Sequence, residues 1–178
     1  MKPIIQTHDG HHFNFLDPRP ASIGIEAVAH ALSHLCRFTG HVSEFYSVAQ
    51  HSLMVSLIVP CEVAREGLLH DAQEAYVGDV ATPLKRLLPE YMLIEERVES
   101  AIAERFSLSW TPDARRAVKQ ADLTMLATEK RDLLGRMEGE LEWALLQNIE
   151  PLGQLVRPMQ PEHAKRAFLE RARELGIA

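Results

Sequence analysis

The sequence predicts an all-α domain with a short β-hairpin at its N-terminus. Apolar residues recur at three- and four-residue spacing along most of the chain, whereas the alternation typical of strands is confined to residues 4–16. Hydrophobic residues make up 46% and charged residues 25% of the 178 positions, which is ordinary for a globular protein. A chain of this length can bury a core without disulfides, so we expect a single domain over residues 1–178.

The first part of the chain predicts the hairpin and two helices. In IIQTHDGHHFNFL, the Asp9-Gly10 pair indicates a tight turn between two strands. SIGIEAVAHALSHLCRF follows with a helical apolar face, and Ser22 is placed to cap that helix. After a loop, SVAQHSLMVSLIV predicts a second helix that ends at Pro60.

The remaining elements are also predicted to be helical. A third helix is expected to run without a break from Glu62 to about Tyr76 and to end near Gly78. ATPLKRLLP indicates a short helix or turn, and YMLIEERVESAIAERF a longer helix. In the next helix Thr111 is the expected cap, followed by Pro112 at the first position. The C-terminal helices, about 138–176, comprise a weaker one around GELEWALLQNI and a last one from Pro161 to Leu175.

Charge and composition exclude several classes of partner. A net charge of −6 and the lack of a basic recognition helix argue against binding to DNA or RNA polymers and against a helical DNA-binding regulator. No apolar run approaches the ~20 residues of a membrane span, and the start of the chain resembles no signal peptide, so no membrane association is expected. The two cysteines, Cys36 and Cys61, form no CxxC motif, so we expect a cytoplasmic protein.

The third helix carries an unusual group of acidic and imidazole side chains in GLLHDAQEAYVGDV. On a helical wheel, Glu74 lies between His70 and Asp71 and one turn further on, so the three can converge. Asp71 points away from the polar stripe that is predicted to face solvent, which consists of Glu62, Glu66 and Gln73. An inward carboxylate is costly unless a cation or a hydrogen-bond partner compensates it. A buried His and Asp bonded to their neighbours would be equally compatible with this helix alone.

Two further helices place a potential ligand on an apolar face. His51 lies on the apolar face of the second helix, and Asp122 lies on the apolar face of the long helix that follows Thr111. Taken singly, each has a structural explanation: a core histidine, or an aspartate paired with Lys119 or Arg115. Together with the His-Asp pair they form a set of two imidazoles and two carboxylates, which suits a divalent transition metal.

The order His51, His70-Asp71, Asp122 resembles the H…HD…D pattern of the HD-domain metal-dependent phosphohydrolases, an all-helical family. The longer stretch LLHDAQEAYVGDVATPLK is similar to the short bacterial 5′-deoxynucleotidases and their phage and prophage relatives, as are RFTGHVSEFYSVAQHS and VKQADLTMLATEKRDL. The likeness covers residues 22–135 approximately. It implies an HD-domain helical bundle over the whole chain, with the C-terminal helices added to its core.

The resemblance implies that His51, His70, Asp71 and Asp122 bind a divalent metal: cobalt, manganese, zinc, iron or nickel. It also implies that Glu74 and Asp79 act beside the metal, one orienting water and the other protonating the leaving group, in an order that the sequence does not assign. A bound ion would make a water nucleophilic at neutral pH for attack on phosphorus.

The resemblance also implies a substrate-binding set. Arg37-Phe38 matches the family's arginine followed by an aromatic residue at the sugar, although the deoxynucleotidases usually have Trp at the second place. Lys85 matches the lysine of the Thr-Pro-x-Lys turn and is expected to hold phosphate oxygens. His41, in the loop before the second helix, is a further candidate for the pocket wall.

The resulting expectation is an enzyme, an HD-type phosphohydrolase that releases phosphate from (deoxy)nucleoside 5′-monophosphates. Two alternatives stay open: a dNTP triphosphohydrolase with the same metal site, and a metal- or nucleotide-binding regulatory module without turnover. The relatives imply a homo-oligomer, and the sequence does not indicate a base preference.

One further motif lies outside this pattern. His30 and His34 are one helical turn apart in the first helix, a spacing that can bind zinc. No third ligand is evident in the sequence, so structural or exposed roles are favoured for both.

Overall fold

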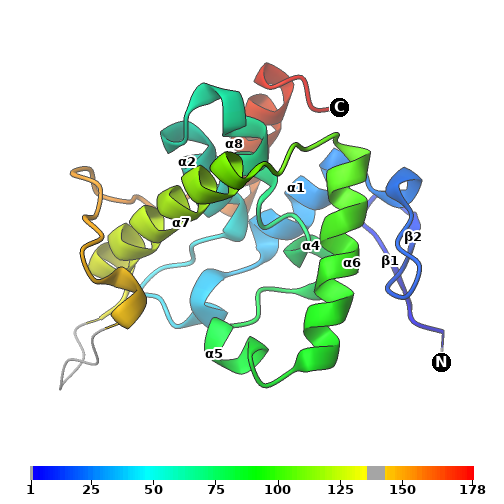
Figure 1. The fold of residues 1–178 in the computed structure, drawn as a ribbon, viewed down its shortest axis with the longest axis horizontal. Coiled ribbons are helices and arrows are strands. Elements are labelled where there is room, and N and C mark those ends of the chain that lie inside the picture. The colour runs from blue at the N-terminus through cyan, green and yellow to red at the C-terminus, as the bar shows by residue number, and fades with distance from the viewer. Residues whose placement is uncertain (1, 136–142) are drawn as a thin grey trace.

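The computed structural model describes residues 2–135 and 143–178, and within them the chain is mostly helical with a two-stranded antiparallel hairpin (Figure 1). The predicted fold class is therefore confirmed at the level of secondary structure. The helices are α1 (Ile25–His34), α2 (Val48–Ile58), α3 (Ala64–Leu69), α4 (Glu74–Val77), α5 (Thr82–Lys85), α6 (Pro89–Arg105), α7 (Pro112–Leu133) and α8 (Pro161–Glu174). No described helix is long and apolar enough to cross a membrane.

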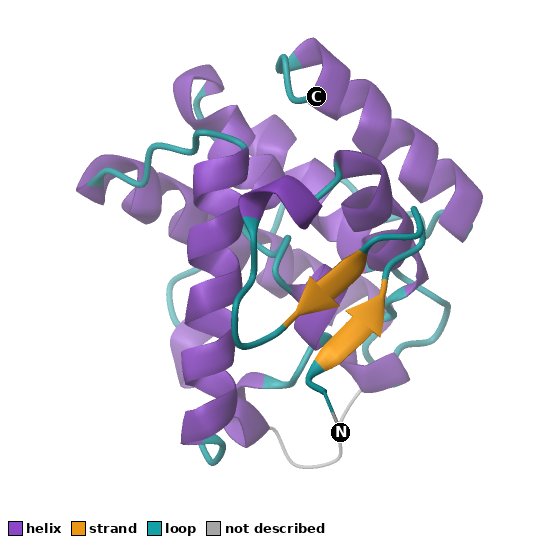
Figure 2. Cartoon of the chain, turned by 90° about the vertical axis from the view of Figure 1, so that its right-hand side faces the viewer, coloured by secondary structure: helices purple, strands orange, loops and turns teal. Residues whose placement is uncertain are grey.

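The predicted hairpin forms at the N-terminus from β1 (Ile4–Gln6) and β2 (His12–Asn14). It lies on the outside of the helices, as Figure 2 shows. Phe13 of β2 is fully buried and stacks on Tyr76 of α4 with ring centroids 4.0 Å apart. One inward-facing aromatic side chain therefore attaches the hairpin to the helical core.

The first helix begins later than predicted. Ser22 is not its cap, because the serine ends a short 3-10 turn (Pro20–Ser22) and its hydroxyl donates to the Arg19 carbonyl oxygen. The chain is extended at Ile23, and α1 starts at Ile25 after Gly24. The proline and the local serine bond favour a separate turn over an extra helical turn.

The two other serine and threonine caps occupy the expected places. Ser47 accepts a hydrogen bond from the Gln50 amide at the start of α2. Thr111 accepts one from the Ala114 amide at the start of α7, with Pro112 in the first turn as predicted. Each bond satisfies an amide that has no partner within its helix.

We expect Thr111→Ala to lower the free energy of unfolding by about 1 kcal/mol, the usual contribution of a helix cap. Ser22→Ala is the matched control and should change it by less than about 0.5 kcal/mol, because Ser22 caps no helix. Urea denaturation of the three proteins measures both effects. Equal destabilisation by the two substitutions would contradict this description of the caps.

The predicted third helix is not continuous. After α3 ends at Leu69, the amides of Ala72 and Glu74 bond to carbonyl oxygens three residues earlier, and α4 begins at Glu74. This tighter spacing changes the direction of each side chain, so a wheel drawn at 100° per residue no longer applies.

The predicted solvent stripe of this region is wrong for two of its three residues. Glu62 is exposed, but Glu66 and Gln73 are buried. Glu66 accepts a hydrogen bond from the Ser109 amide at 2.7 Å, which compensates a carboxylate in the interior. Composition alone does not show such a distant backbone partner.

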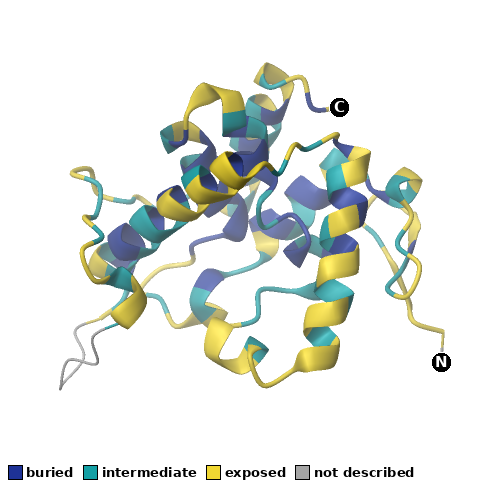
Figure 3. Ribbon diagram, viewed as in Figure 1, coloured by how far each residue is buried: buried dark blue, intermediate teal, exposed yellow. Residues whose placement is uncertain are grey.

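The middle of the molecule is built around α2, which is buried over most of its length (Figure 3). One apolar cluster joins the hairpin, α1, α2, α3, α6 and α8, and a second joins α2, α3 and α7. A Cβ at Gly67 would lie 3.1 Å from the Ser56 Cα, so the glycine permits α3 to approach α2 closely. This contact brings the end of α3 beside α2.

The C-terminal part agrees in part with the prediction. The helix expected around GELEWALLQNI begins outside the described residues, and its described part contains a 3-10 turn at Ala144–Leu146. The last helix is confirmed as α8. Gly176 follows it with φ of +65°, a conformation that favours glycine.

Candidate metal centre

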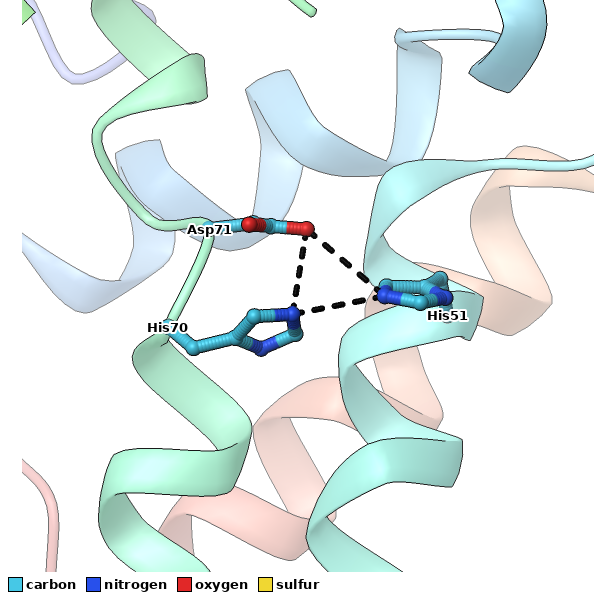
Figure 4. A group of neighbouring side chains, drawn as sticks. All are labelled: His51, His70 and Asp71. Atoms are coloured by element: carbon cyan, nitrogen blue, oxygen red, sulfur yellow. Dashed lines mark hydrogen bonds and ion pairs between the residues drawn. The ribbon is translucent and has the colours of Figure 1, made fainter. Parts of the chain in front are cut away.

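Three of the four predicted metal ligands converge at the junction of α2 and the end of α3 (Figure 4). His51 Nε2 lies 3.3 Å from His70 Nε2 and 3.7 Å from Asp71 Oδ2, and His70 Nε2 lies 3.2 Å from the same oxygen. His51 is fully buried, whereas His70 and Asp71 are partly accessible. The three side chains could therefore share one metal ion that is reached from solvent.

Asp122 of α7 adjoins this group. Its Oδ1 lies 3.3 Å from His51 Nε2, and its Oδ2 accepts a bond from Lys119 Nζ at 2.8 Å. Asp122 therefore forms the ion pair with Lys119 through one oxygen and lies beside His51 with the other. Three helical segments, far apart in sequence, supply the four side chains.

Hydrogen bonds on the outer side of each ring determine which nitrogen faces the centre. His51 Nδ1 lies 2.6 Å from Glu129 Oε1, and His70 Nδ1 lies 2.9 Å from the Gly67 carbonyl oxygen. Since both partners are acceptors, we assign the hydrogen of each ring to Nδ1. The two Nε2 lone pairs then point toward each other and toward carboxylate oxygens.

The geometry fits a divalent cation. Adjacent ligands at about 2.0–2.2 Å from one ion are about 2.8–3.6 Å from one another in tetrahedral or octahedral arrangement. The separations among the ligand atoms of His51, His70 and Asp71 are 3.2, 3.3 and 3.7 Å, close to this range. Lone pairs and negative charges at such distances repel unless positive charge lies among them. His51, His70 and Asp71 are therefore suited to hold a metal, and Asp122 lies beside them through its contact with His51.

The cluster also attracts protons. Burial and the charge of Arg37 lower the pKa of His51, but the carboxylates of Glu129 and Asp122 outweigh them and raise it to about 9. Burial raises the pKa of Asp122, yet its hydrogen bond and charge interaction with His51 hold it well below the usual value. A proton and a metal ion thus compete for the same centre, as is usual for imidazole ligands.

Glu129, which was not among the residues predicted for the site, joins two of the candidate residues. It is fully buried, bonds His51 through Oε1, and accepts from Arg37 Nε at 3.1 Å through Oε2. A carboxylate behind a histidine ligand fixes the ring orientation and strengthens it as a ligand. The sequence signal for Glu129 is its spacing from Asp122: it follows Asp122 by two helical turns, so both residues lie on the same face of α7.

Arg37 extends from Glu129 toward the candidate ligands. It is buried, and its Nη1 lies 3.7 Å from Asp71 Oδ2. Burial lowers the pKa of the guanidinium, but the charges of Glu129, Asp71 and Glu74 outweigh this and raise it. Arg37 therefore remains a cation at the edge of the centre.

The backbone after Arg37 is strained. Phe38 and Thr39 have φ of +56° and +54°, a left-handed conformation that costs non-glycine residues of order 1–3 kcal/mol each. The Phe38 ring lies 5.3 Å from the Arg37 guanidinium carbon and 6.5 Å from the ring centre of Trp143. The strained turn thus places an aromatic side chain beside the buried arginine.

Glu74 and Asp79 lie within electrostatic reach of the centre. Burial raises the pKa of Glu74 well above its usual value, and the charges of Asp71 and Asp79 raise it further. Burial also raises the pKa of Asp79, against the lowering effect of Arg37. Among the described residues, Glu74 Oε2 is buried without a hydrogen-bond partner. Gly78, with φ of +83°, ends α4 and directs the chain to Asp79.

The two other predicted substrate residues differ in position. Lys85 of α5 is partly buried, and its Nζ donates to Glu95 Oε1 at 2.6 Å. The positive charge of Lys85 lowers the pKa values of Glu74 and Asp79 and so offsets part of the increase that burial causes. His41 is exposed, and its side chain makes no hydrogen bond or ion pair to any residue that the structure describes. The role of His41 in a pocket stays a prediction.

No family model matches the sequence. The uncharacterized protein YfdR of Escherichia coli K12 is 45% identical over 174 residues, which cover 97% of this chain and 96% of that protein. The chain belongs to the YfdR family. An uncharacterized protein of Rhodobacter capsulatus is similar to the same chain, with 32% identity over 177 residues that cover 91% of it and 90% of the relative. The names of these two relatives of the YfdR family state no activity.

Proposed function

We propose that this YfdR-family protein is an HD-domain metal-dependent phosphohydrolase that releases phosphate from deoxynucleoside 5′-monophosphates. The convergence of His51, His70 and Asp71, with Asp122 beside His51, carries the proposal. His51 and His70 present their Nε2 atoms 3.3 Å apart, with Asp71 and Asp122 oxygens beside them. The resemblance of LLHDAQEAYVGDVATPLK to the 5′-deoxynucleotidases then supports a phosphate ester as the substrate.

A divalent ion held by these four residues would supply a nucleophile at neutral pH by lowering the pKa of water to about 7. The protein's own contribution is to place charge around the phosphate. Arg37 stays charged beside Asp71, and Lys85 lies on the side of Glu74 and Asp79. Both cations are suited to bind phosphate oxygens.

Glu74 and Asp79 are the candidates for proton transfer. Glu74 is the better proton carrier of the two, because burial and neighbouring carboxylates raise its pKa the more strongly. We propose that Glu74 gives a proton to the departing nucleoside oxygen and that Asp79 orients the attacking water. Phe38 would contact the sugar, since an apolar wall suits a ring without a 2′-hydroxyl.

The test is hydrolysis of a panel of ribo- and deoxynucleoside mono- and triphosphates, each with cobalt, manganese, zinc, iron or nickel. We expect inorganic phosphate from the deoxynucleoside monophosphates. Release of intact triphosphate from dNTPs would favour the triphosphohydrolase instead. A complete lack of hydrolysis with all five metals would overturn both and leave a regulatory module.

We expect Lys85→Met to raise KM for the nucleotide about tenfold or more, because a charge-assisted hydrogen bond to phosphate would be lost. Arg86→Met is the matched control, since Arg86 is the exposed neighbour of Lys85 and should leave KM within about twofold. Steady-state phosphate release measures both. An equal KM for the two variants would remove Lys85 from the proposed substrate site.

A further inference from the structure

A third histidine completes the His30–His34 pair. His8, in the turn between β1 and β2, stacks on His30 with ring centroids 3.5 Å apart and planes 5° apart. The ring centroid of His34 lies 4.4 Å from that of His30. The hairpin and α1 therefore form a row of three imidazoles on the side of α1 that faces α8.

These histidines form one wall of a cleft of about 440 Å3. The other wall belongs to α8 and has four charged side chains, of which three are cations: Glu162, Lys165, Arg166 and Arg173. The cleft is thus positive even with neutral histidines, on a chain whose net charge is −6.

The positive charge of this wall is largely uncompensated. Lys165 forms one distant ion pair, with Glu26 at 3.7 Å. Within residues 2–135 and 143–178, Arg166 and Arg173 form no ion pair and no side-chain hydrogen bond. Both guanidinium groups can therefore turn toward a ligand in the cleft.

The arrangement does not suit a metal ion. The lone pairs of an imidazole lie in its ring plane, and the planes of His8 and His30 are nearly parallel, so their nitrogens cannot aim at one ion. Three neighbouring cations would also repel a divalent metal. A negatively charged ligand satisfies the charge of the same cleft and needs no convergence of lone pairs.

We propose that the cleft between the β1–β2 turn, α1 and α8 is a second ligand site, which binds a small molecule with a polyphosphate chain. Its volume is within the usual range for small-molecule sites. Forked guanidinium groups such as those of Arg166 and Arg173 are suited to bidentate contact with phosphate. None of the candidate metal ligands lies on these elements, so the inference does not depend on the proposed catalytic function.

Binding should strengthen as the pH falls. Burial lowers the pKa of His30, and the charges of His8, His34 and Lys165 lower it further. A polyanion would oppose that repulsion, so His30 would gain a proton when the ligand binds. The other charged groups around the rings are Asp9 next to His8, Glu26 on α1, and Glu162, Arg166 and Arg173 on α8.

The experiment titrates tripolyphosphate and a deoxynucleoside triphosphate into the metal-free protein with EDTA, by calorimetry at constant ionic strength. We expect Arg166→Gln/Arg173→Gln to weaken binding about tenfold or more. The control, Arg19→Gln/Arg116→Gln, removes two exposed arginines elsewhere and should weaken it less than about twofold. In the unchanged protein, binding should tighten at least about threefold from pH 7.5 to 6.0, and His30→Gln should reduce that change.

Comparison of the two ligands distinguishes a free polyphosphate from a nucleotide as the bound molecule. Equal affinities would identify the chain itself as the recognised group, and tighter binding of the deoxynucleoside triphosphate would identify a nucleotide. The proposal is overturned if neither ligand binds, or if the α8 variant and the control bind equally. The second result would place any binding outside this cleft. Circular dichroism confirms that each variant is folded.

Discussion

Asp71→Ala should lower the rate of phosphate release by more than about 100-fold and should reduce the metal content of the purified protein. Asp71 Oδ2 lies 3.2 Å from His70 Nε2 and 3.7 Å from His51 Nε2, so its loss removes the carboxylate that joins the two imidazoles. Loss of a residue that only supports a metal ligand typically costs ~10–100-fold, and loss of a ligand should cost at least as much. Phosphate release and elemental analysis measure the two effects.

Asp113→Ala is the matched control for this substitution. Asp113 lies in the first turn of α7 with its side chain 84% exposed, so its removal should leave both rate and metal content unchanged. Thermal unfolding of both variants separates loss of the centre from loss of the fold. A folded Asp71→Ala protein with more than about a tenth of the original rate and full metal content would contradict the assignment of Asp71. Loss of metal content alone, in a protein without turnover, would favour a regulatory module.

The positions of the candidate ligands could be predicted because each carries its own sequence signal. His51 and Asp122 are polar residues on apolar helical faces, and a polar residue in such a place needs a partner. The structure places His51 beside the His70-Asp71 pair, and Asp122 beside His51. Their convergence follows from the contact of α2 with α3 and α7, which the periodicity of the helices does not specify.

Other features could not be predicted because they depend on local tightening of the chain or on distant backbone. The wheel of a continuous helix placed both Glu66 and Gln73 in solvent. For Gln73 it fails because the chain changes to three-residue hydrogen bonds after Leu69. Glu66 is stabilised by the backbone amide of Ser109, 43 residues away in sequence. His8 likewise joins His30 only because the hairpin folds onto α1. Local patterns carry no signal for such contacts.

Glu129 connects fold stability with the candidate site. The carboxylate is fully buried and bonds both His51 and Arg37, so one acidic group compensates two buried basic groups. Burial raises its pKa, but the charges of Arg37 and His51 outweigh this and keep the pKa below its usual value. The arrangement orients His51 toward the metal centre and holds Arg37 at its edge. Any change at this position should therefore affect stability and metal binding together.

We expect Glu129→Ala to lower the free energy of unfolding by about 3–5 kcal/mol, because it removes the buried carboxylate that bonds both Arg37 and His51. For a chain of this size the midpoint of thermal unfolding should fall by roughly 6–20 °C. Metal affinity should fall by about 10–100-fold, since His51 loses the partner of its Nδ1. Glu170→Ala, an exposed residue of α8, is the control and should change the free energy by less than about 0.5 kcal/mol.

A double-mutant cycle distinguishes loss of the Glu129–Arg37 pair from loss of packing volume. If Arg37 is destabilising once Glu129 is absent, Arg37→Ala in the Glu129→Ala protein should cost far less than in the original protein. The coupling free energy should then exceed about 1 kcal/mol, well above the deviation from additivity of independent sites. Strictly additive losses would mean that the two side chains contribute separately, and that Glu129 does not hold Arg37 beside Asp71. A coupling of the expected size, with metal affinity lost in Glu129→Ala but retained in Glu170→Ala, would make the carboxylate the common support of the arginine and the imidazole.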